Sequence, residues 1–190
     1  HSNLVFYRTT PKFIVLGEET MSIKKLKKDV LNSFIDSMIA SDQSVVGVKE
    51  KVQSKGSKFA FGPLETADDL RLDYDLAIIP PKKYMLPANE TLLTFQVKGE
   101  SKQHVDDQKL ILVGVHPYDM VAINQMDELF SQDEYDTHYM TRRKNITIIA
   151  CDVVTPSENV FAASMETATV DKGFDILLTD LGKGKEYVAE

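Results

Sequence analysis

The stretch Lys109-Leu110-Ile111-Leu112-Val113-Gly114-Val115 decides the fold, and it ends at His116-Pro117. It is a nearly continuous apolar run. A strand that is buried on both faces has this pattern, as in a parallel sheet covered by helices, whereas a half-exposed strand alternates polar and apolar residues. Two similar runs follow, at 146–150 and 174–180. The sequence therefore predicts an α/β fold, with a mixed sheet and flanking helices.

Other segments predict the remaining elements. Residues 21–41 carry apolar residues at helical spacing, with four lysines among the first eight positions, and predict a helix with a solvated basic face. A second helix is predicted over about 120–130, with Asp119 as its N-cap. Shorter apolar or alternating runs predict further strands. They lie at 44–53, 59–63, 76–79, 92–97 and 187–188.

The polar segment 99–108 is the best internal boundary of the chain. It separates residues 21–98, which are predicted to form an N-terminal lobe, from residues 109–190, which are predicted to form an α/β lobe. The whole length also suits one domain with a shared core. Residues 1–20 precede Met21 and are interpreted as an extension, a processing remnant or sequence added for expression.

Composition excludes several function classes. The chain of 190 residues has 22 Lys+Arg against 29 Asp+Glu, a net charge of −7 that argues against nucleic-acid binding. It has no long apolar stretch and no signal peptide, so we expect no membrane insertion and a cytoplasmic location. A single cysteine excludes a disulfide scaffold. It also excludes a complete iron–sulfur cluster held by four cysteines of this chain.

The ends of the buried strands hold the residues best suited to chemistry, because ligands gather beyond the carboxyl ends of parallel strands. Cys151 is a nucleophile candidate if His116 lies nearby, and otherwise a small buried residue. A pocket near His116, Tyr118 and Cys151 is a candidate site for a small anion or a cofactor. Arg142 and Arg143 can bind an anion or a partner carboxylate. The sequence has no glycine-rich phosphate loop, and its histidines lack zinc-site spacing, so no metal site is predicted.

Several strings along the chain match one family in order and spacing. They are Phe61-Gly62-Pro63-Leu64-Glu65, Leu72-Asp73-Tyr74, Pro80-Pro81-Lys82-Lys83-Tyr84, Gly114-Val115-His116-Pro117-Tyr118-Asp119, Tyr139 with Arg142-Arg143, and Gly173-Phe174-Asp175-Ile176-Leu177-Leu178-Thr179-Asp180. With them, the chain from Met21 onward resembles the N-terminal domain of a family of iron–sulfur electron-transfer subunits. That family includes the beta subunit of sulfhydrogenase and one of the subunits of anaerobic sulfite reductase.

The resemblance implies four cluster-binding cysteines, and this chain keeps one of them. Cys151 stands at one of the four positions, and the others are occupied by Tyr118, Val160 and Ala162. Tyrosine, valine and alanine supply no soft ligand. We therefore expect a degenerate cluster site that binds no metal. Glu166 and Ala168 stand where the family pattern has two glycines.

The resemblance also implies a function. We expect an N-terminal scaffold or docking domain of an iron–sulfur oxidoreductase subunit, one that catalyses nothing alone. The 4Fe–4S clusters are then expected in a C-terminal continuation of the chain, and the partners are other subunits of a redox complex. Two alternatives stay open: a non-redox module that binds a small anion or cofactor, and a cysteine-dependent hydrolase or transferase.

Overall fold

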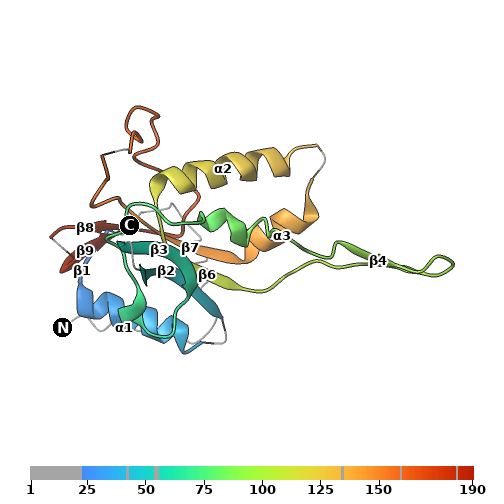
Figure 1. Ribbon diagram of the computed structural model, residues 1–190, viewed down its shortest axis with the longest axis horizontal. Coiled ribbons are helices and arrows are strands. Elements are labelled where there is room, and N and C mark those ends of the chain that lie inside the picture. Colours follow the sequence, from blue (N-terminus) through green and yellow to red (C-terminus); the bar gives the residue numbers. More distant parts are fainter. Residues whose placement is uncertain (1–22, 42, 54–55, 134, 159, 183) are drawn as a thin grey trace, which may run out of the picture.

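The fold is built on one mixed sheet of seven strands. The computed structural model describes residues 23–190 except 42, 54–55, 134, 159 and 183. The strand order is β1-β9-β8-β7-β6-β2-β3, with helices on both faces (Figure 1). The predicted α/β class is confirmed. Strands from both sides of segment 99–108 share this sheet.

Four parallel strands form the centre of the sheet. They are β2 (Ser44–Gln53), β6 (Leu110–Val115), β7 (Ile146–Cys151) and β8 (Ile176–Asp180). The middle two, β6 and β7, are buried along nearly their whole length. Their continuous apolar sequences follow from this burial on both faces.

Antiparallel strands complete both edges. β3 (Gly56–Pro63) pairs with β2 by a hairpin, while β9 (Glu186–Ala189) pairs with β8. At the far edge, β1 (Lys24–Lys27) pairs with β9. The predicted helix over 21–41 is therefore wrong at its start, because backbone pairing with a sequence-remote strand outweighs the local helical spacing. Residues 21 and 22 lie outside the described part of the chain.

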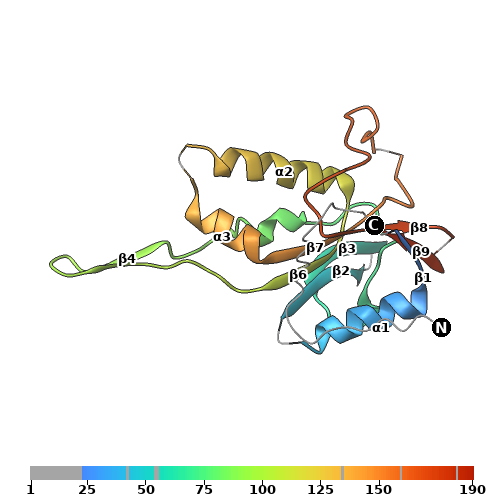
Figure 2. The ribbon, with the colours of Figure 1, turned by 180° about the vertical axis from the view of Figure 1, so that it is seen from behind.

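The helices cover opposite faces of the sheet (Figures 1 and 2). On one face lies α1 (Lys28–Ile39), which packs Leu31 and Ile35 into one apolar core. On the other lie α2 (Pro117–Ser131) and α3 (Thr137–Asn145) over a second core. Two short 3-10 helices, η1 (Ala67–Asp69) and η2 (Pro81–Tyr84), interrupt the connection between β3 and β4.

Several predicted boundaries need correction. Residues 76–79 form no strand; Ala77 makes a single bridge to Phe59. The helix α3, which the sequence did not predict, begins at an Asp136 cap that accepts from the Tyr139 N–H at 2.8 Å. The N-cap residue of α2 is His116, and Asp119 lies inside its first turn. Pro117 explains this shift, because proline favours the first helical position.

A separate two-stranded hairpin projects from the body (Figures 1 and 2). Its strands are β4 (Leu93–Phe95) and β5 (Ser101–Gln103), and all their side chains are exposed. We call residues 92–103 the arm. The arm includes the first half of the polar segment 99–108 that was predicted as a boundary.

Candidate functional site

The predicted strand-end residues meet at the carboxyl edge of the central sheet. His116 follows β6 and begins α2, while Cys151 is the last residue of the neighbouring β7. Just before His116, Gly114 has a φ of 87°, and the register of β6 against β7 shifts there. Glycine adopts this left-handed conformation without the steric cost that a side chain would add.

His116 is fully buried and joins two backbone segments. Its Nδ1 lies 3.0 Å from the Cys151 carbonyl oxygen, and its Nε2 lies 3.0 Å from the Tyr74 carbonyl oxygen. Burial lowers the pKa of His116, although both carbonyl contacts raise it. A neutral imidazole has one N–H and satisfies one of these oxygens, whereas the imidazolium satisfies both. Either way the ring holds backbone in place, and neither nitrogen is free.

Aromatic rings fill the space around His116. The Tyr74 ring stacks on the imidazole at 4.0 Å between centroids, with an interplanar angle of 22°. The Tyr118 ring lies 5.3 Å from the imidazole centroid. The Tyr74 hydroxyl donates to the Gly114 carbonyl at 2.6 Å, and the Tyr118 hydroxyl donates to the Asp75 carbonyl. Both phenol hydroxyl groups are therefore bonded to backbone carbonyl oxygens of this chain.

Cys151 lies beside this group, but it lacks the properties of a reactive thiol. Its Sγ is 3.6 Å from His116 Nδ1, so the proximity that a nucleophile pair needs is present. Burial raises the pKa of the Cys151 thiol, and the nearby Asp152 raises it further. The thiolate is therefore disfavoured, the opposite of what activates a catalytic cysteine.

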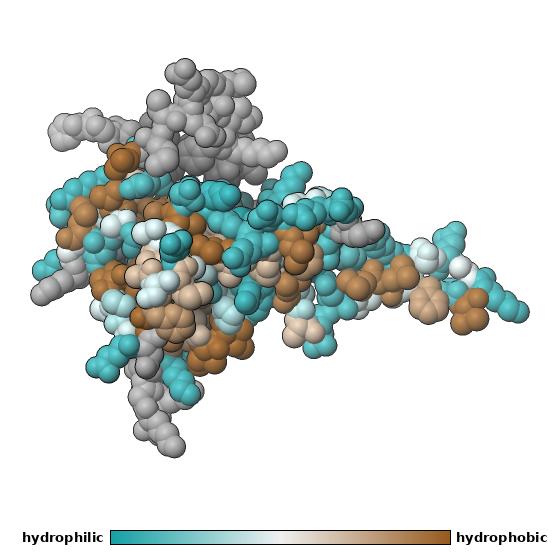
Figure 3. Space-filling model, turned by 90° about the horizontal axis from the view of Figure 1, so that it is seen from above, coloured by the Kyte–Doolittle hydropathy of each residue, from teal (hydrophilic) through white to brown (hydrophobic). Residues whose placement is uncertain are grey.

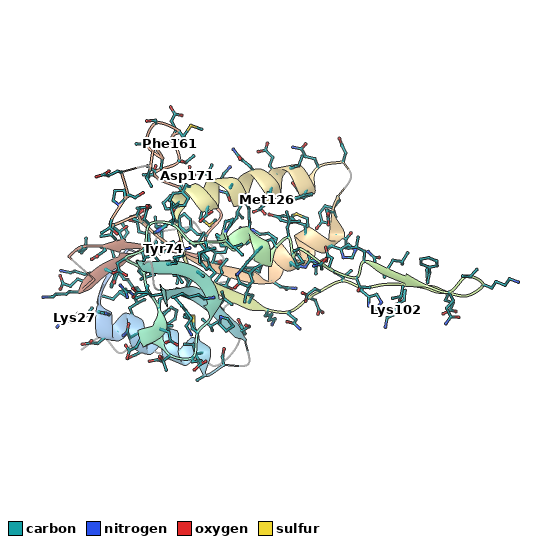
Figure 4. The ribbon with its side chains drawn as sticks, in the orientation of Figure 1. Lys27, Tyr74, Lys102, Met126, Phe161 and Asp171 are labelled. Atoms are coloured by element: carbon teal, nitrogen blue, oxygen red, sulfur yellow. The ribbon has the colours of Figure 1, made fainter. Side chains whose placement is uncertain are left out.

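Val160 and Ala162 lie on the long loop between β7 and β8, which rises above the sheet (Figure 4). The loop forms a compact turn, in which the Thr167 N–H donates to Ala162 O at 2.9 Å and the Glu166 N–H donates to Ala163 O at 3.2 Å. Glu166 has a φ of 55°, so the chain keeps a left-handed residue where the family pattern has glycine. These two bonds and this φ match the helix-ending motif that usually has glycine.

The Phe161 side chain at the tip of this turn is 67% exposed. Figure 4 shows it at the top of the loop, well separated from Tyr74 in the centre of the fold. The four positions implied by the resemblance therefore divide into two groups. Tyr118 and Cys151 flank His116, whereas Val160 and Ala162 belong to the loop above.

Arg142 and Arg143 are engaged within the protein. Arg142 is buried, donates to the Met85 carbonyl at 2.8 Å and pairs with Glu90. Arg143 Nε lies 2.8 Å from an Asp127 carboxylate oxygen, and its Nη2 donates to the Gly173 carbonyl at 2.7 Å. Arg143 thus ties α3 to α2 and to the end of the loop after β7. The Tyr139 hydroxyl also donates to Asp127, at 2.7 Å.

The donor atoms of the predicted site do not fit an iron–sulfur cluster. One thiol is present, and burial disfavours its ionised form. Tyr118 directs its hydroxyl at a backbone oxygen, and Val160 and Ala162 carry no donor atom in their side chains. Across the described part of the chain, no three His, Cys, Asp or Glu residues gather in an arrangement that could hold a metal ion.

A cleft of about 510 Å³ is lined by the start of α1, by residues from the segment 67–73 and by the loops after β7 and β8, and it includes none of the predicted site residues. Two basic residues, Lys28 and Arg71, face three acidic ones, Asp68, Asp73 and Asp180. Arg71 pairs with Asp73 at 2.8 Å and also with Glu50. These charges nearly balance, so the cleft shows no preference for an anion.

Sequence reasoning missed Tyr74, Asp75 and Asp127, which complete the contacts of the predicted residues. The string Leu72-Asp73-Tyr74 was part of the resemblance, but nothing in the sequence linked it to the strand ends. Asp127 lies within the predicted second helix, with no pattern that marks it as the partner of Arg143.

Comparison with known proteins identifies an informative relative. Sulfhydrogenase 2 subunit beta from Pyrococcus furiosus is 34% identical over 128 residues, which is 67% of this chain and 38% of that protein. The chain therefore spans well under half the length of its curated relative. No family model matches the sequence, and no solved structure matches it significantly. Over the aligned residues, the chain belongs to the sulfhydrogenase beta subunit family.

Proposed function

We propose that this chain is the N-terminal domain of an electron-transfer subunit in an iron–sulfur oxidoreductase. The relative's name makes it one subunit of a sulfhydrogenase, which supports this assignment. The domain would act as a scaffold or docking element, with other subunits of a redox complex as partners. Its 4Fe–4S clusters would lie in a C-terminal continuation. From the composition of the sequence, we also propose that the protein is cytoplasmic and that it binds neither nucleic acid nor membrane lipid. Among the described helices, none has the length and apolar character to cross a membrane.

The observation that carries the proposal is the packing beside Cys151. Tyr118 stands at one of the cysteine positions that the resemblance implies, and its ring lies 5.3 Å from the imidazole of His116, on which the Tyr74 ring also stacks. Cores are packed as densely as organic crystals, so a vacated cluster must be replaced by side-chain volume. The Tyr118 ring supplies such volume. It supports a domain that keeps the family's scaffold without its own cluster.

Arg142 and Arg143 support the scaffold role. Their guanidinium groups bind backbone oxygens and carboxylates of this chain. The two side chains thus hold the end of η2 and the loop after β7. Because these contacts occupy the guanidinium groups, the arginines are poor candidates for binding an external anion. The two arginines of the family pattern would therefore serve to hold together the elements of this domain.

Iron and acid-labile sulfide content tests the proposal directly. After anaerobic reconstitution and desalting, the chain is expected to retain neither iron nor visible charge-transfer absorption. The matched variant carries Tyr118→Cys, Val160→Cys and Ala162→Cys, which restores the four family positions. Circular dichroism checks that both proteins are folded.

Stoichiometric iron and sulfide in the unmodified chain would contradict the proposal of a lost cluster. Iron bound by the variant alone would support it, because the scaffold would then still accept a cluster once thiolates are present. A folded variant that binds no iron would show that the aromatic packing has also closed the site.

A further inference from the structure

The arm (residues 92–103) exposes apolar side chains far from the body. Leu92 and Leu93 are each 50% exposed, Phe95 is 71% exposed and Val97 is 93% exposed. Figure 3 shows hydrophobic side chains among hydrophilic ones along the projecting part of the molecule. Soluble proteins rarely expose contiguous apolar residues without a partner. An isolated two-stranded hairpin is also only marginally stable in water.

The outer edge of β4 offers backbone hydrogen-bonding groups that no other described strand pairs with. His104 N–H donates to Leu92 O at 3.0 Å, and Leu93 lies opposite Gln103, while Thr94 lies opposite Lys102. Hydrogen-bonded pairs alternate along an antiparallel ladder. The N–H and C=O groups of Leu93 and Phe95 therefore point away from β5, toward the outer edge.

The outer edge of β4 lacks the charged side chains that protect an edge strand from pairing. By contrast, β1, at one edge of the seven-stranded sheet, has lysine at three of its four positions, Lys24, Lys25 and Lys27. Residues 91–97 carry no charge, whereas β5 carries Lys102 on the opposite strand of the arm (Figure 4). Lysines on edge strands hinder edge-to-edge pairing, and β4 has none.

We propose that β4 is a dimerisation strand, which pairs antiparallel with β4 of a second copy of this chain. In the register that uses the outward groups, Leu93 lies opposite Phe95 of the second copy, and the two Thr94 residues face each other at the two-fold axis. Each Leu–Phe pair brings together an aliphatic and an aromatic side chain, a favourable cross-strand combination. The result is a four-stranded sheet in the order β5-β4-β4-β5.

The second copy is favoured by the lack of charge on β4 and by symmetry. An uncharged strand can pair with itself without like-charge repulsion, although each chain has a net charge of −7. Pairing through β5 would instead bring two copies of Lys102 together. Antiparallel pairing is also self-complementary, as a two-fold interface requires. The arm is small compared with the roughly 800 Å² per partner of a stable interface. The dimer is therefore expected to be weak and concentration-dependent.

Cysteine cross-linking tests the register. Thr94→Cys places two thiols opposite each other in a non-hydrogen-bonded pair, whose Cα separation of about 4.5 Å suits a disulfide. The one native cysteine, Cys151, is buried and does not compete. The control is Lys102→Cys, which lies directly across the same hairpin on β5. Under a mild oxidant, the Thr94→Cys variant is expected to form linked dimers about tenfold faster or more than the control, because pairing raises the effective thiol concentration.

Sedimentation analysis provides an independent test. The unmodified chain is expected to shift from monomer toward dimer with rising concentration, and Phe95→Lys is expected to abolish the shift while leaving the circular dichroism spectrum unchanged. Equal cross-linking rates for the two cysteine variants would overturn the proposal, as would a chain that remains monomeric at every concentration. Capture of a different subunit by the arm of a monomeric chain would also overturn the assignment to a second copy.

Discussion

Gly173 allows the sharpest test of how the loop after β7 is anchored. It has a φ of 92°, and its carbonyl accepts from Arg143. A Cβ at this position would lie 1.9 Å from Asn124 Oδ1, far inside contact distance. The Asn124 side chain donates to Lys172 O at 3.0 Å, so it cannot move away without losing that bond. We therefore expect Gly173→Ala to destabilise the protein by two separable effects.

The magnitude follows from these two costs. A left-handed backbone costs a residue with a Cβ about 1–2 kcal/mol relative to glycine. Displacing Asn124 loses a hydrogen bond worth about 1 kcal/mol. The free energy of unfolding of Gly173→Ala is therefore expected to fall by about 2–3 kcal/mol. In an Asn124→Ala background the clash is absent, and the same substitution should cost only the backbone term, about 1–2 kcal/mol.

Equilibrium unfolding in urea, followed by circular dichroism, measures all four proteins of this cycle. The matched control is Gly182→Ala, where an added Cβ would meet no atom within 4 Å, and its effect should stay within about 0.5 kcal/mol. The reasoning is refuted if Gly173→Ala is as stable as the control. It is also refuted if removing the Asn124 side chain leaves the cost of Gly173→Ala unchanged.

Three further predictions concern single side chains. Tyr74→Phe removes the buried bond to Gly114 O and should cost about 1–2 kcal/mol in urea unfolding, with Tyr84→Phe, whose hydroxyl makes no such bond to a described residue, as the near-neutral control. Burial raises the pKa of Asp119 to about 6, so the folded state binds its proton more tightly than the unfolded chain, and stability is lost as the pH rises through about 6. Asp119→Asn should therefore be more stable by about 1–2 kcal/mol at about pH 8 and lose this advantage at about pH 4; an equal gain at both pH values would contradict this cause. Glu166→Gly should raise the free energy of unfolding by about 0.5–1 kcal/mol, measured by thermal unfolding, because glycine suits the left-handed φ at this position. A similar gain from Ala168→Gly, where the φ is not left-handed, would contradict this explanation.

The central strands could be predicted because their burial inside the fold requires apolar sequences that can be recognised. β6 and β7 are buried on both faces, and this demands apolar residues at every position. The meeting of His116 with Cys151 followed from the same strands, since parallel neighbours end at the same edge of a sheet. For β6 and β7, the predictions based on the apolar pattern of the sequence are therefore confirmed.

The elements that could not be predicted depend on remote partners. β1 is rich in lysine, and it is a strand because it pairs with β9 near the other end of the described chain. α3 is polar along most of its length, and its buried residues are Tyr139 and Arg142, which no amphipathic pattern marks. Its one local signal was the Asp136 cap before a run of basic residues at the helix end.

The contacts of the site could not be predicted for a related reason. Tyr74 lies in an irregular segment between η1 and η2, and no periodicity connects such a segment with a strand end. Its ring stacks on His116 because the chain there crosses the carboxyl edge of the sheet. Only the folded arrangement shows that Tyr74 and Tyr118 pack around His116, beside Cys151.

The pairing of β1 with β9 has a consequence for synthesis on the ribosome. β1 is made before every other described strand, yet its neighbour in the sheet is made after all of them. Closing a loop of this length carries a large entropic cost, and such non-local contacts form slowly. During translation, the segment of β1 therefore stays unpaired until β9 has been synthesised, while β2, β6 and β7 can already pair with one another. The lysines of β1 help to prevent this unpaired segment from aggregating.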